Sequence, residues 1–211
     1  MNPHGEIIAL VGMSGVGKSH WGKRLKGKGF QRFDCDTEIA KLGAMVDLDG
    51  TSSPVHAIGA WMGMPWSEGY KARETRYLAL EKEVTLQAIE RAKASEGPLV
   101  IDCTGSVIYL GKEVLEALRS AAHVVHIQAP QSLHRTLLQR YTRKPKPIVW
   151  KDAFRIQLGE TNEQALARCY PGLLNFREER YRALAHRGVS GEELAALTEA
   201  RALTVLLDKG L

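Results

Sequence analysis

The chain has few cysteines, and its three, Cys35, Cys103 and Cys169, are widely spaced. An odd number at this spacing matches neither a disulfide framework nor the paired ligands of a zinc site. This usage is typical of a reducing compartment, so we expect a cytoplasmic protein. Residues 1–5 contain no basic segment followed by an apolar one, and no secretory signal is therefore expected.

Long apolar runs and internal repeats are also missing from the sequence. No stretch is apolar for long enough to cross a bilayer, so we expect no membrane partner. The formal net charge of +5 permits a nucleic-acid partner, but no stripe of aromatic and basic residues suited to base stacking is visible. We therefore expect no nucleic-acid partner. A hydrophobic fraction of 44% is enough for the core of one domain, residues 1–211, whose oligomeric state stays open.

The strongest motif lies at residues 12–19, Gly-Met-Ser-Gly-Val-Gly-Lys-Ser, and matches the phosphate-binding pattern G-x-x-x-x-G-K-[ST] at every fixed position. An apolar stretch at 6–11 precedes it and helix-forming residues at 20–26 follow it, which is the strand-loop-helix context that the motif requires. The glycines let successive N–H groups form a cradle, and the helix N-terminus adds partial positive charge. The motif predicts ATP and Mg²⁺ as cofactors; the alternative is a plain glycine-rich turn.

The side chains of this loop have expected roles. Lys18 can reach the terminal phosphates and is expected to act in catalysis, and the hydroxyl of Ser19 can bind Mg²⁺. The residues expected to hold the nucleotide are Gly12, Ser14, Gly15, Val16, Gly17, Lys18, Ser19 and, from a later helix, Arg140.

Three aspartates follow predicted strands. Asp34 and Asp36 end a short alternating strand, and Asp102 ends an apolar one. The carboxyl ends of strands in a doubly wound sheet face the crevice where ligands bind. We expect Asp102 and Ser19 to order Mg²⁺, Asp34 to bind Mg²⁺ or take the proton of a substrate hydroxyl, and Asp36 to contact substrate. The alternatives are that Asp36 only caps a helix and that Asp102 only ends a strand.

Basic residues and prolines alternate at residues 142–148. Such a segment suits a mobile lid that closes cations over phosphates and excludes water. We expect Arg140, Arg143 and Lys146 to supply these cations, the last two in catalysis; the alternative is a solvated basic loop. Lid and insertion together are expected at about 140–176.

The rest of the chain predicts further elements of the same kind. We expect a strand at 123–129 and helices at 68–94, 112–119, 133–141, 177–185 and 190–200. Residues 150–176 show no regular pattern, and 203–207 fit either a strand or a helical tail. About 36–95 is expected to form the substrate-binding helical region, with bulky residues at 55–66 in the core or in the pocket. Residues 47–51 resemble a phosphatase nucleophile motif without its strand, so we expect a surface turn there.

With these residues described, the chain resembles the shikimate kinase family of small P-loop kinases, over residues 7–193 with gaps. The likeness rests on GMSGVGKS, on FDCDTEI, which is similar to the family's F-x-D-x-D-x-x-I, and on the late pattern R-x-x-x-Y-x-x-x-A that begins at Arg177. Lys146-Pro147 stands where the family's lid has Arg-Pro. The resemblance implies an α/β three-layer sandwich with a mostly parallel sheet of about five strands, helices on both faces and a lid.

The resemblance also implies roles for single residues. Asp34 would act with Mg²⁺ or in catalysis, and Asp36 would bind substrate hydroxyls. Arg177 would grip a substrate carboxylate, and Gly105 would contact the substrate within Thr-Gly-Ser, which replaces the family's Gly-Gly-Gly.

The sequence departs from the family in three places. The family's Phe-Arg pair with its Glu is best matched at 69–74, which makes Lys71 the substrate cation, whereas a second register at 77–81 has no cation at that place. The stretch between the lid and Arg177 is longer than in the family. The family's last strand is nearly absent around 186–189.

These features predict an ATP- and Mg²⁺-dependent kinase that transfers the γ-phosphoryl group to a hydroxyl of a small, polar, acidic metabolite. Two alternatives stay open. One is a kinase for gluconate or a nucleoside, with which the loop start and Cys103 are compatible. The other is a nucleotide-binding regulatory protein that turns over no metabolite.

Overall fold

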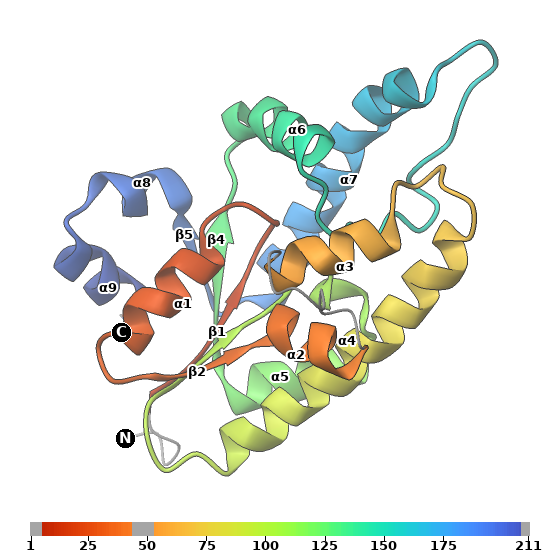
Figure 1. Ribbon diagram of the computed structural model, residues 1–211. Coiled ribbons are helices and arrows are strands. Elements are labelled where there is room, and N and C mark those ends of the chain that lie inside the picture. Colours follow the sequence, from red (N-terminus) through yellow and green to blue (C-terminus); the bar gives the residue numbers. More distant parts are fainter. Residues whose placement is uncertain (1–5, 44–52, 208–211) are drawn as a thin grey trace.

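The computed structural model describes residues 6–43 and 53–207. Its centre is one five-stranded sheet with the order β2-β3-β1-β4-β5, in which all four pairings are parallel (Figure 1). The strands are β1 (Ile7–Val11), β2 (Gln31–Asp34), β3 (Leu99–Asp102), β4 (His123–Gln128) and β5 (Arg187–Ser190). The predicted α/β fold with a parallel sheet is confirmed.

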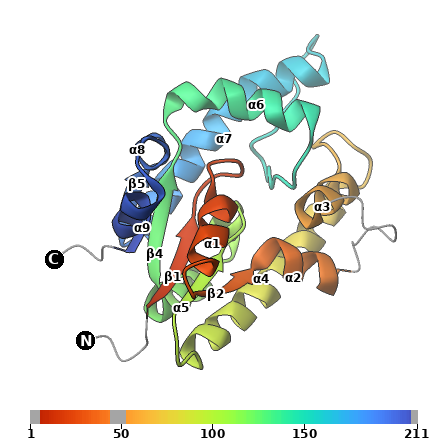
Figure 2. The same cartoon turned by 60° about the vertical axis from the view of Figure 1, so that its left-hand side comes forward.

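Helices cover both faces of the sheet, which makes three layers (Figures 1 and 2). One layer is α1 (Lys18–Lys26), α8 (Gly191–Ala196) and α9 (Glu199–Leu207). The other contains α2 (Cys35–Leu42), α3 (Pro54–Met62), α4 (Tyr70–Lys93), α5 (Lys112–Ala121) and α7 (Asn162–Leu184), with α6 (His134–Arg143) above the carboxyl ends of the strands and short 3₁₀ helices at Val107–Tyr109 and Gln131–Leu133. None of the helices in the described ranges is long and apolar enough to span a membrane.

The two cores follow from the alternation of side chains along β1. Ile8 and Leu10 pack under α1, α8 and α9, whereas Ile7, Ala9 and Val11 pack in the larger core of the opposite face. All five residues are buried, as a central strand of a parallel sheet requires. A parallel sheet also brings the loops after all its strands to one edge, so the site lies there.

The C-terminal third contains more regular structure than the sequence pattern predicted. Residues 150–176 were expected to be irregular, but α7 begins at Asn162 behind a capping box formed by Thr161 and Gln164. Pro171 lies inside this helix and obscures its pattern, while Leu166, Tyr170 and the leucines at 173 and 174 are buried in the core.

Two smaller corrections and one decided alternative concern the end of the chain. The last strand, expected to be nearly absent, is present as β5 and pairs with β4. The single helix expected at 190–200 is interrupted at Leu197, whose backbone is extended, so α8 and α9 are separate. Residues 203–207 are helical. The motif at 47–51 lies outside the described residues.

The central helices agree better with expectation. The long helix α4 spans Tyr70–Lys93, close to the predicted 68–94, and α5, α6 and β4 lie where they were expected. In α3, Ala57, Ile58 and Met62 are buried in the core, which favours the core interpretation of this stretch.

Candidate functional site

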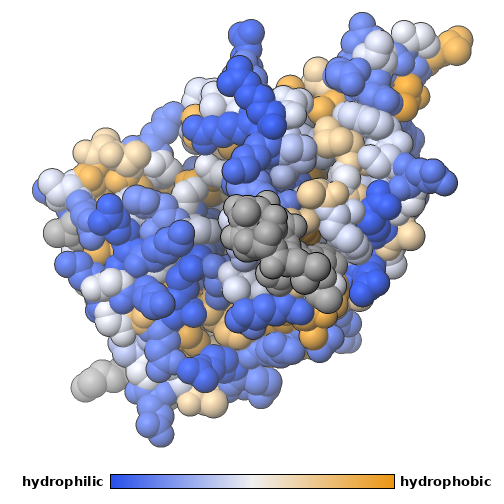
Figure 3. Space-filling view, in the orientation of Figure 1, coloured by the Kyte–Doolittle hydropathy of each residue, from blue (hydrophilic) through white to orange (hydrophobic). Residues whose placement is uncertain are grey.

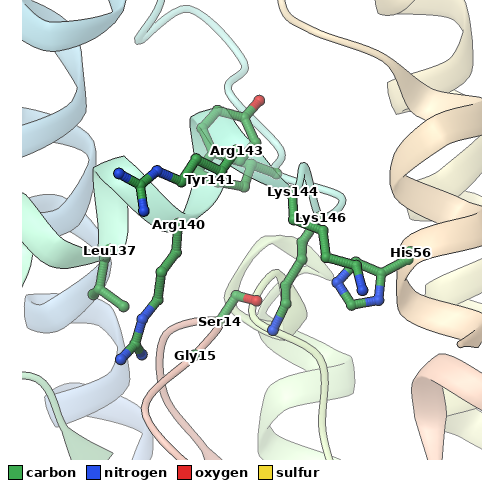
Figure 4. A pocket seen from close by; sticks show the side chains of 10 residues that line it. Ser14, Gly15, His56, Leu137, Arg140, Tyr141, Arg143, Lys144 and Lys146 are labelled. Carbon is green, nitrogen blue, oxygen red and sulfur yellow. The ribbon is translucent and has the colours of Figure 1, made fainter.

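Two cavities adjoin over the P-loop, at the carboxyl edge of the sheet. The smaller, of about 190 Å³, lies between the P-loop, Asp36 of α2, Tyr77 of α4, and Lys146. The larger, of about 400 Å³, lies under α6 and is lined by basic side chains (Figure 4). Both are bordered by Ser14, Gly15 and Lys146, so one ligand could extend from one cavity into the other.

The P-loop has the geometry that its sequence predicted. Gly15 and Gly17 have φ of 93° and 105°, which glycine adopts without strain. Gly12, with φ of 139°, packs so closely on β4 that a Cβ there would lie 2.5 Å from the carbonyl oxygen of Ile127. The loop therefore tolerates no side chain at position 12.

Lys18 is held by the loop itself. Its Nζ donates to the carbonyl oxygens of Gly12 at 2.8 Å and of Met13 at 2.9 Å. Burial lowers the pKa of Lys18, and the neighbouring Asp102 and Asp36 oppose that shift. A phosphate entering the cradle offers this ammonium group a charged acceptor in place of two neutral carbonyls.

Arg32, which sequence reasoning did not single out, joins two of the predicted acidic residues. Its Nη2 lies 2.8 Å from Oδ2 of Asp34 and also forms an ion pair with Oδ2 of Asp102. Asp34 and Asp102 are register partners on β2 and β3, where like charges repel. The sequence contained one indication of this ion pair: Arg32 and Asp34 are two residues apart on one strand, so their side chains lie on the same face.

The helix after the P-loop leaves room for this ion pair. Gly22 lies in α1, and a Cβ there would approach Nε of Arg32 to 3.0 Å and Oδ2 of Asp102 to 3.4 Å. Glycine is unfavourable in a helix interior by about 1 kcal/mol relative to alanine. Its presence at position 22 is explained by the guanidinium group beneath it.

The carboxylates were predicted to bind Mg²⁺, and the contacts of these side chains test that prediction. Asp34 is the N-cap of α2, where its Oδ1 accepts from the N–H of Thr37 at 3.2 Å while its Oδ2 faces Arg32. Asp102 is 3% exposed and paired with Arg32. In this arrangement neither fits a metal ligand. Ser19 is exposed and borders the smaller cavity, so its hydroxyl fits one.

Asp36 is the carboxylate that borders the smaller cavity. β2 ends at Asp34, so Asp36 lies in the first turn of α2 and not on the strand, and the cap of this helix is Asp34 instead. Burial raises the pKa of Asp36 to about 6, and Lys18 is the main group that opposes the shift. Asp36 thus shares the cavity with Lys18 and Lys146.

A layer of buried polar groups lies beneath this cavity. Thr104 donates to Glu81, and Ser106 donates to the hydroxyl of Tyr77 at 3.2 Å. Burial raises the pKa of Glu81 to about 7. Tyr77 and Glu81 belong to the second of the two registers considered for α4. Tyr77 borders the smaller cavity, whereas Lys71 of the first register is exposed and borders neither cavity. The substrate role expected for Lys71 therefore stays a prediction, and it would require this side chain to turn toward the cavity.

The guanidinium group of Arg177 is hydrogen-bonded inside the protein. Its guanidinium donates to the carbonyl oxygens of Gly105 at 3.2 Å and Val149 at 2.6 Å, and it stacks over the ring of Tyr109. The residue is 2% exposed and lies behind Gly105, which itself borders the cavity. A grip on a substrate carboxylate stays a prediction, and it would require Arg177 to exchange these bonds.

The basic segment after α6 is docked over the site. At Gly59 of α3, a Cβ would lie 2.5 Å from the carbonyl oxygen of Pro145. Further along, Oε1 of Glu74 accepts from the N–H groups of Trp150 at 2.6 Å and Lys151 at 3.0 Å. Lys151 has φ of 50°, a turn that presents both N–H groups to one carboxylate.

The lid cations differ in direction. Figure 4 shows Arg140 and Lys146 extending toward Ser14 and Gly15, whereas Arg143 extends sideways and not toward these two residues. All three border the larger cavity. Burial lowers the pKa of Lys146, and Asp36 opposes the shift. On the outer surface, hydrophilic side chains gather over α6 (Figure 3).

Known proteins were compared with the chain. No family model and no curated protein matches its sequence. Among solved structures, it is similar to shikimate kinase from Acinetobacter baumannii in complex with shikimate, at 21% identity and a TM-score of 0.61, over 99% of this chain and 97% of that one. The fold is that of the shikimate kinases.

Two further shikimate kinases show the same fold. The enzyme from Aquifex aeolicus has 19% identity and a TM-score of 0.54, covering 95% of this chain and 92% of that one. The enzyme from Bacteroides thetaiotaomicron has 16% identity and a TM-score of 0.56, covering 95% and 97%. The Arg32–Asp102 pair and the exposed Lys71 are features of this chain's own side chains.

Proposed function

We propose that the protein is an ATP- and Mg²⁺-dependent kinase whose acceptor is a hydroxyl of a small polar metabolite. One observation carries the proposal: Lys18 of the P-loop and Asp36 border the same small cavity under Lys146. The P-loop is the anion cradle, and Asp36 is the carboxylate that faces it. A phosphoryl donor and a hydroxyl acceptor need these two groups at one place.

The donor side uses the P-loop and the lid. The N–H groups of residues 15–18 would hold the β- and γ-phosphates, and Lys18 would leave the carbonyl oxygens of Gly12 and Met13 for the moving phosphoryl group. Arg140 and Lys146 would complete the positive surroundings from above. Bound Mg²⁺ would neutralise phosphate charge, with the hydroxyl of Ser19 as its ligand.

The acceptor side centres on Asp36. A carboxylate with a pKa of about 6 is ionised at neutral pH and still basic enough to accept the proton of a substrate hydroxyl as attack proceeds. This role was expected for Asp34, whose two oxygens are instead engaged by Thr37 and Arg32. We therefore assign the role of proton acceptor to Asp36.

The acceptor is proposed to be no larger than a six-carbon polyol or cyclic acid, because the smaller cavity holds about 190 Å³. An acid group on it would meet Lys146, since Lys71 is exposed and Arg177 is engaged by carbonyl oxygens. The regions 36–95 and 140–176 then supply the substrate wall and the lid with its insertion.

ADP release from Mg-ATP tests the proposal, measured with shikimate and then with a panel of sugar acids, polyols and nucleosides. Acceleration by one compound that falls strongly in Asp36→Asn supports it and identifies the acceptor class. If ATP binds but no compound accelerates ADP release, the kinase proposal fails, and the regulatory alternative gains. Glu38→Gln is the matched control, because Glu38 lies on the same helix and pairs with Lys41.

A further inference from the structure

Arg32 occupies the point where two carboxylates meet. One terminal nitrogen, Nη2, contacts an oxygen of Asp34 and an oxygen of Asp102. These two aspartates are side by side on neighbouring strands. A point shared by two carboxylate oxygens is where a protein-bound divalent cation would lie. In this chain a guanidinium group fills that point.

The arrangement is built into the fold. The side chain of Arg32 is 11% exposed and that of Asp102 is 3% exposed, so the pair is shielded from water. Gly22 supplies the space above it. Asp34 uses its second oxygen to cap α2, which holds this carboxylate in place toward Arg32. Two strands and two helices therefore contribute to one ion-paired cluster.

We propose that Arg32 is the built-in cation of this acidic pair, and that it keeps Asp34 and Asp102 from binding a divalent metal ion in the nucleotide-free protein. Metal then enters the site only together with the phosphates of a nucleotide. The second statement rests on the proposed function, whereas the first concerns the protein without nucleotide.

Loss of the guanidinium should convert the cluster into a metal site. In Arg32→Met the side chain keeps a flexible apolar stem but lacks the guanidinium group, so two neighbouring carboxylates lose their shared positive charge. Repulsion between them lowers stability, and a divalent cation relieves it. The variant should therefore have a lower melting temperature that Mn²⁺ or Mg²⁺ raises again.

Mn²⁺ binding to the nucleotide-free, full-length protein tests this, by titration calorimetry and by the electron paramagnetic resonance signal of free Mn²⁺. Four proteins are compared: wild type, Asp102→Asn, Arg32→Met and the double variant. We expect wild type and Asp102→Asn to bind Mn²⁺ with the same affinity. Arg32→Met should bind Mn²⁺ at least about tenfold more tightly, as more uncompensated carboxylate charge dictates, and the double variant should lose this gain.

Either of two results overturns the proposal. One is wild-type protein that binds Mn²⁺ tightly and loses the binding in Asp102→Asn, which would make Asp102 a metal ligand already. The other is folded Arg32→Met that binds Mn²⁺ no better than wild type. If Arg32→Met cannot be purified, the comparison of wild type with Asp102→Asn decides. Nucleotide binding is measured separately, and its failure would contradict the proposed function without touching Arg32.

Discussion

Gly59 and Lys146 are in direct backbone contact, because a Cβ built at Gly59 would lie 2.9 Å from the Cα of Lys146. The lid therefore packs directly on the backbone of α3 at Gly59. Because this residue has no Cβ, the lid can lie close enough to place the ammonium group of Lys146 over the cavity.

Gly59→Ala should displace the lid. The added Cβ would meet the carbonyl oxygen of Pro145 at 2.5 Å, so the segment must move outward and carry Lys146 with it. We expect ADP release with the accepted substrate to fall by about tenfold or more, as misplacement of a positioning group by about 1 Å can cause. Steady-state kinetics measure the effect.

The matched control is Gly172→Ala. Gly172 lies inside α7, and a Cβ there meets nothing within 4 Å, so the same substitution should raise stability by up to about 1 kcal/mol and leave activity unchanged. Equal activities of the two variants would show that the contact at Gly59 does not position the lid.

Lys18→Met should abolish turnover. It removes the ammonium group that is proposed to stabilise charge on the transferred phosphoryl group, and we expect kcat to fall by about 100-fold or more. Lys23→Met, an exposed position on the same helix, should have no effect. Turnover that survives in Lys18→Met would refute the role given to the P-loop.

The pH profile should reveal Asp36. Its pKa is raised to about 6, and only the ionised carboxylate can accept a proton, so kcat/KM should rise with pH through about 6 and level off above it. The residual activity of Asp36→Asn should lack this rising limb. A profile that stays flat from about one unit below this pKa to about two units above it would exclude Asp36 as the base.

Glu81 should make stability depend on pH. Its pKa is about 7 in the folded protein against 4.5 ordinarily, so between these values the folded protein holds a proton that the unfolded chain has released. The free energy of unfolding therefore falls as pH rises through this window. We expect Glu81→Gln to be more stable than wild type by about 2 kcal/mol at pH 8, with no such gain at pH 4.

Urea denaturation at the two pH values measures this difference. Glu83→Gln, at an exposed position of the same helix, serves as the control and should give equal stability to wild type at both. A loss of stability in Glu81→Gln at pH 8 would mean that the bond from Thr104 outweighs the burial of the charge.

Local patterns predicted the parts of the site that depend on local chain geometry. The P-loop could be recognised because its glycines and its flanking strand and helix are contiguous in the sequence. The pairing of Arg32 with Asp102 could not, because it depends on β2 lying beside β3 and on the space over Gly22. Such contacts can be predicted only when the order of the strands in the sheet is known.

The expectation at Lys71 rests on a different kind of pattern. The pattern Tyr-x-x-x-Glu occurs twice in α4, at Tyr70 and Glu74 and again at Tyr77 and Glu81. All four residues are buried, because a spacing of seven returns to the same helix face. The sequence favoured the first pair for its cation, whereas Tyr77 of the second pair borders the smaller cavity.

Glu74 and Glu81 connect α4 both to the chain that follows the lid and to the buried polar layer beneath the smaller cavity. Glu74 pins the chain at Trp150 and Lys151, and Glu81 supports Thr104, about 10 Å along the same helix by its rise per residue. Residues 144–147 connect α6 to the segment that Glu74 holds, so we expect an opening of the lid to be a movement of these residues. Fully extended, they reach at most about 14 Å, so opening of this site is the motion of a short strap tethered at both ends.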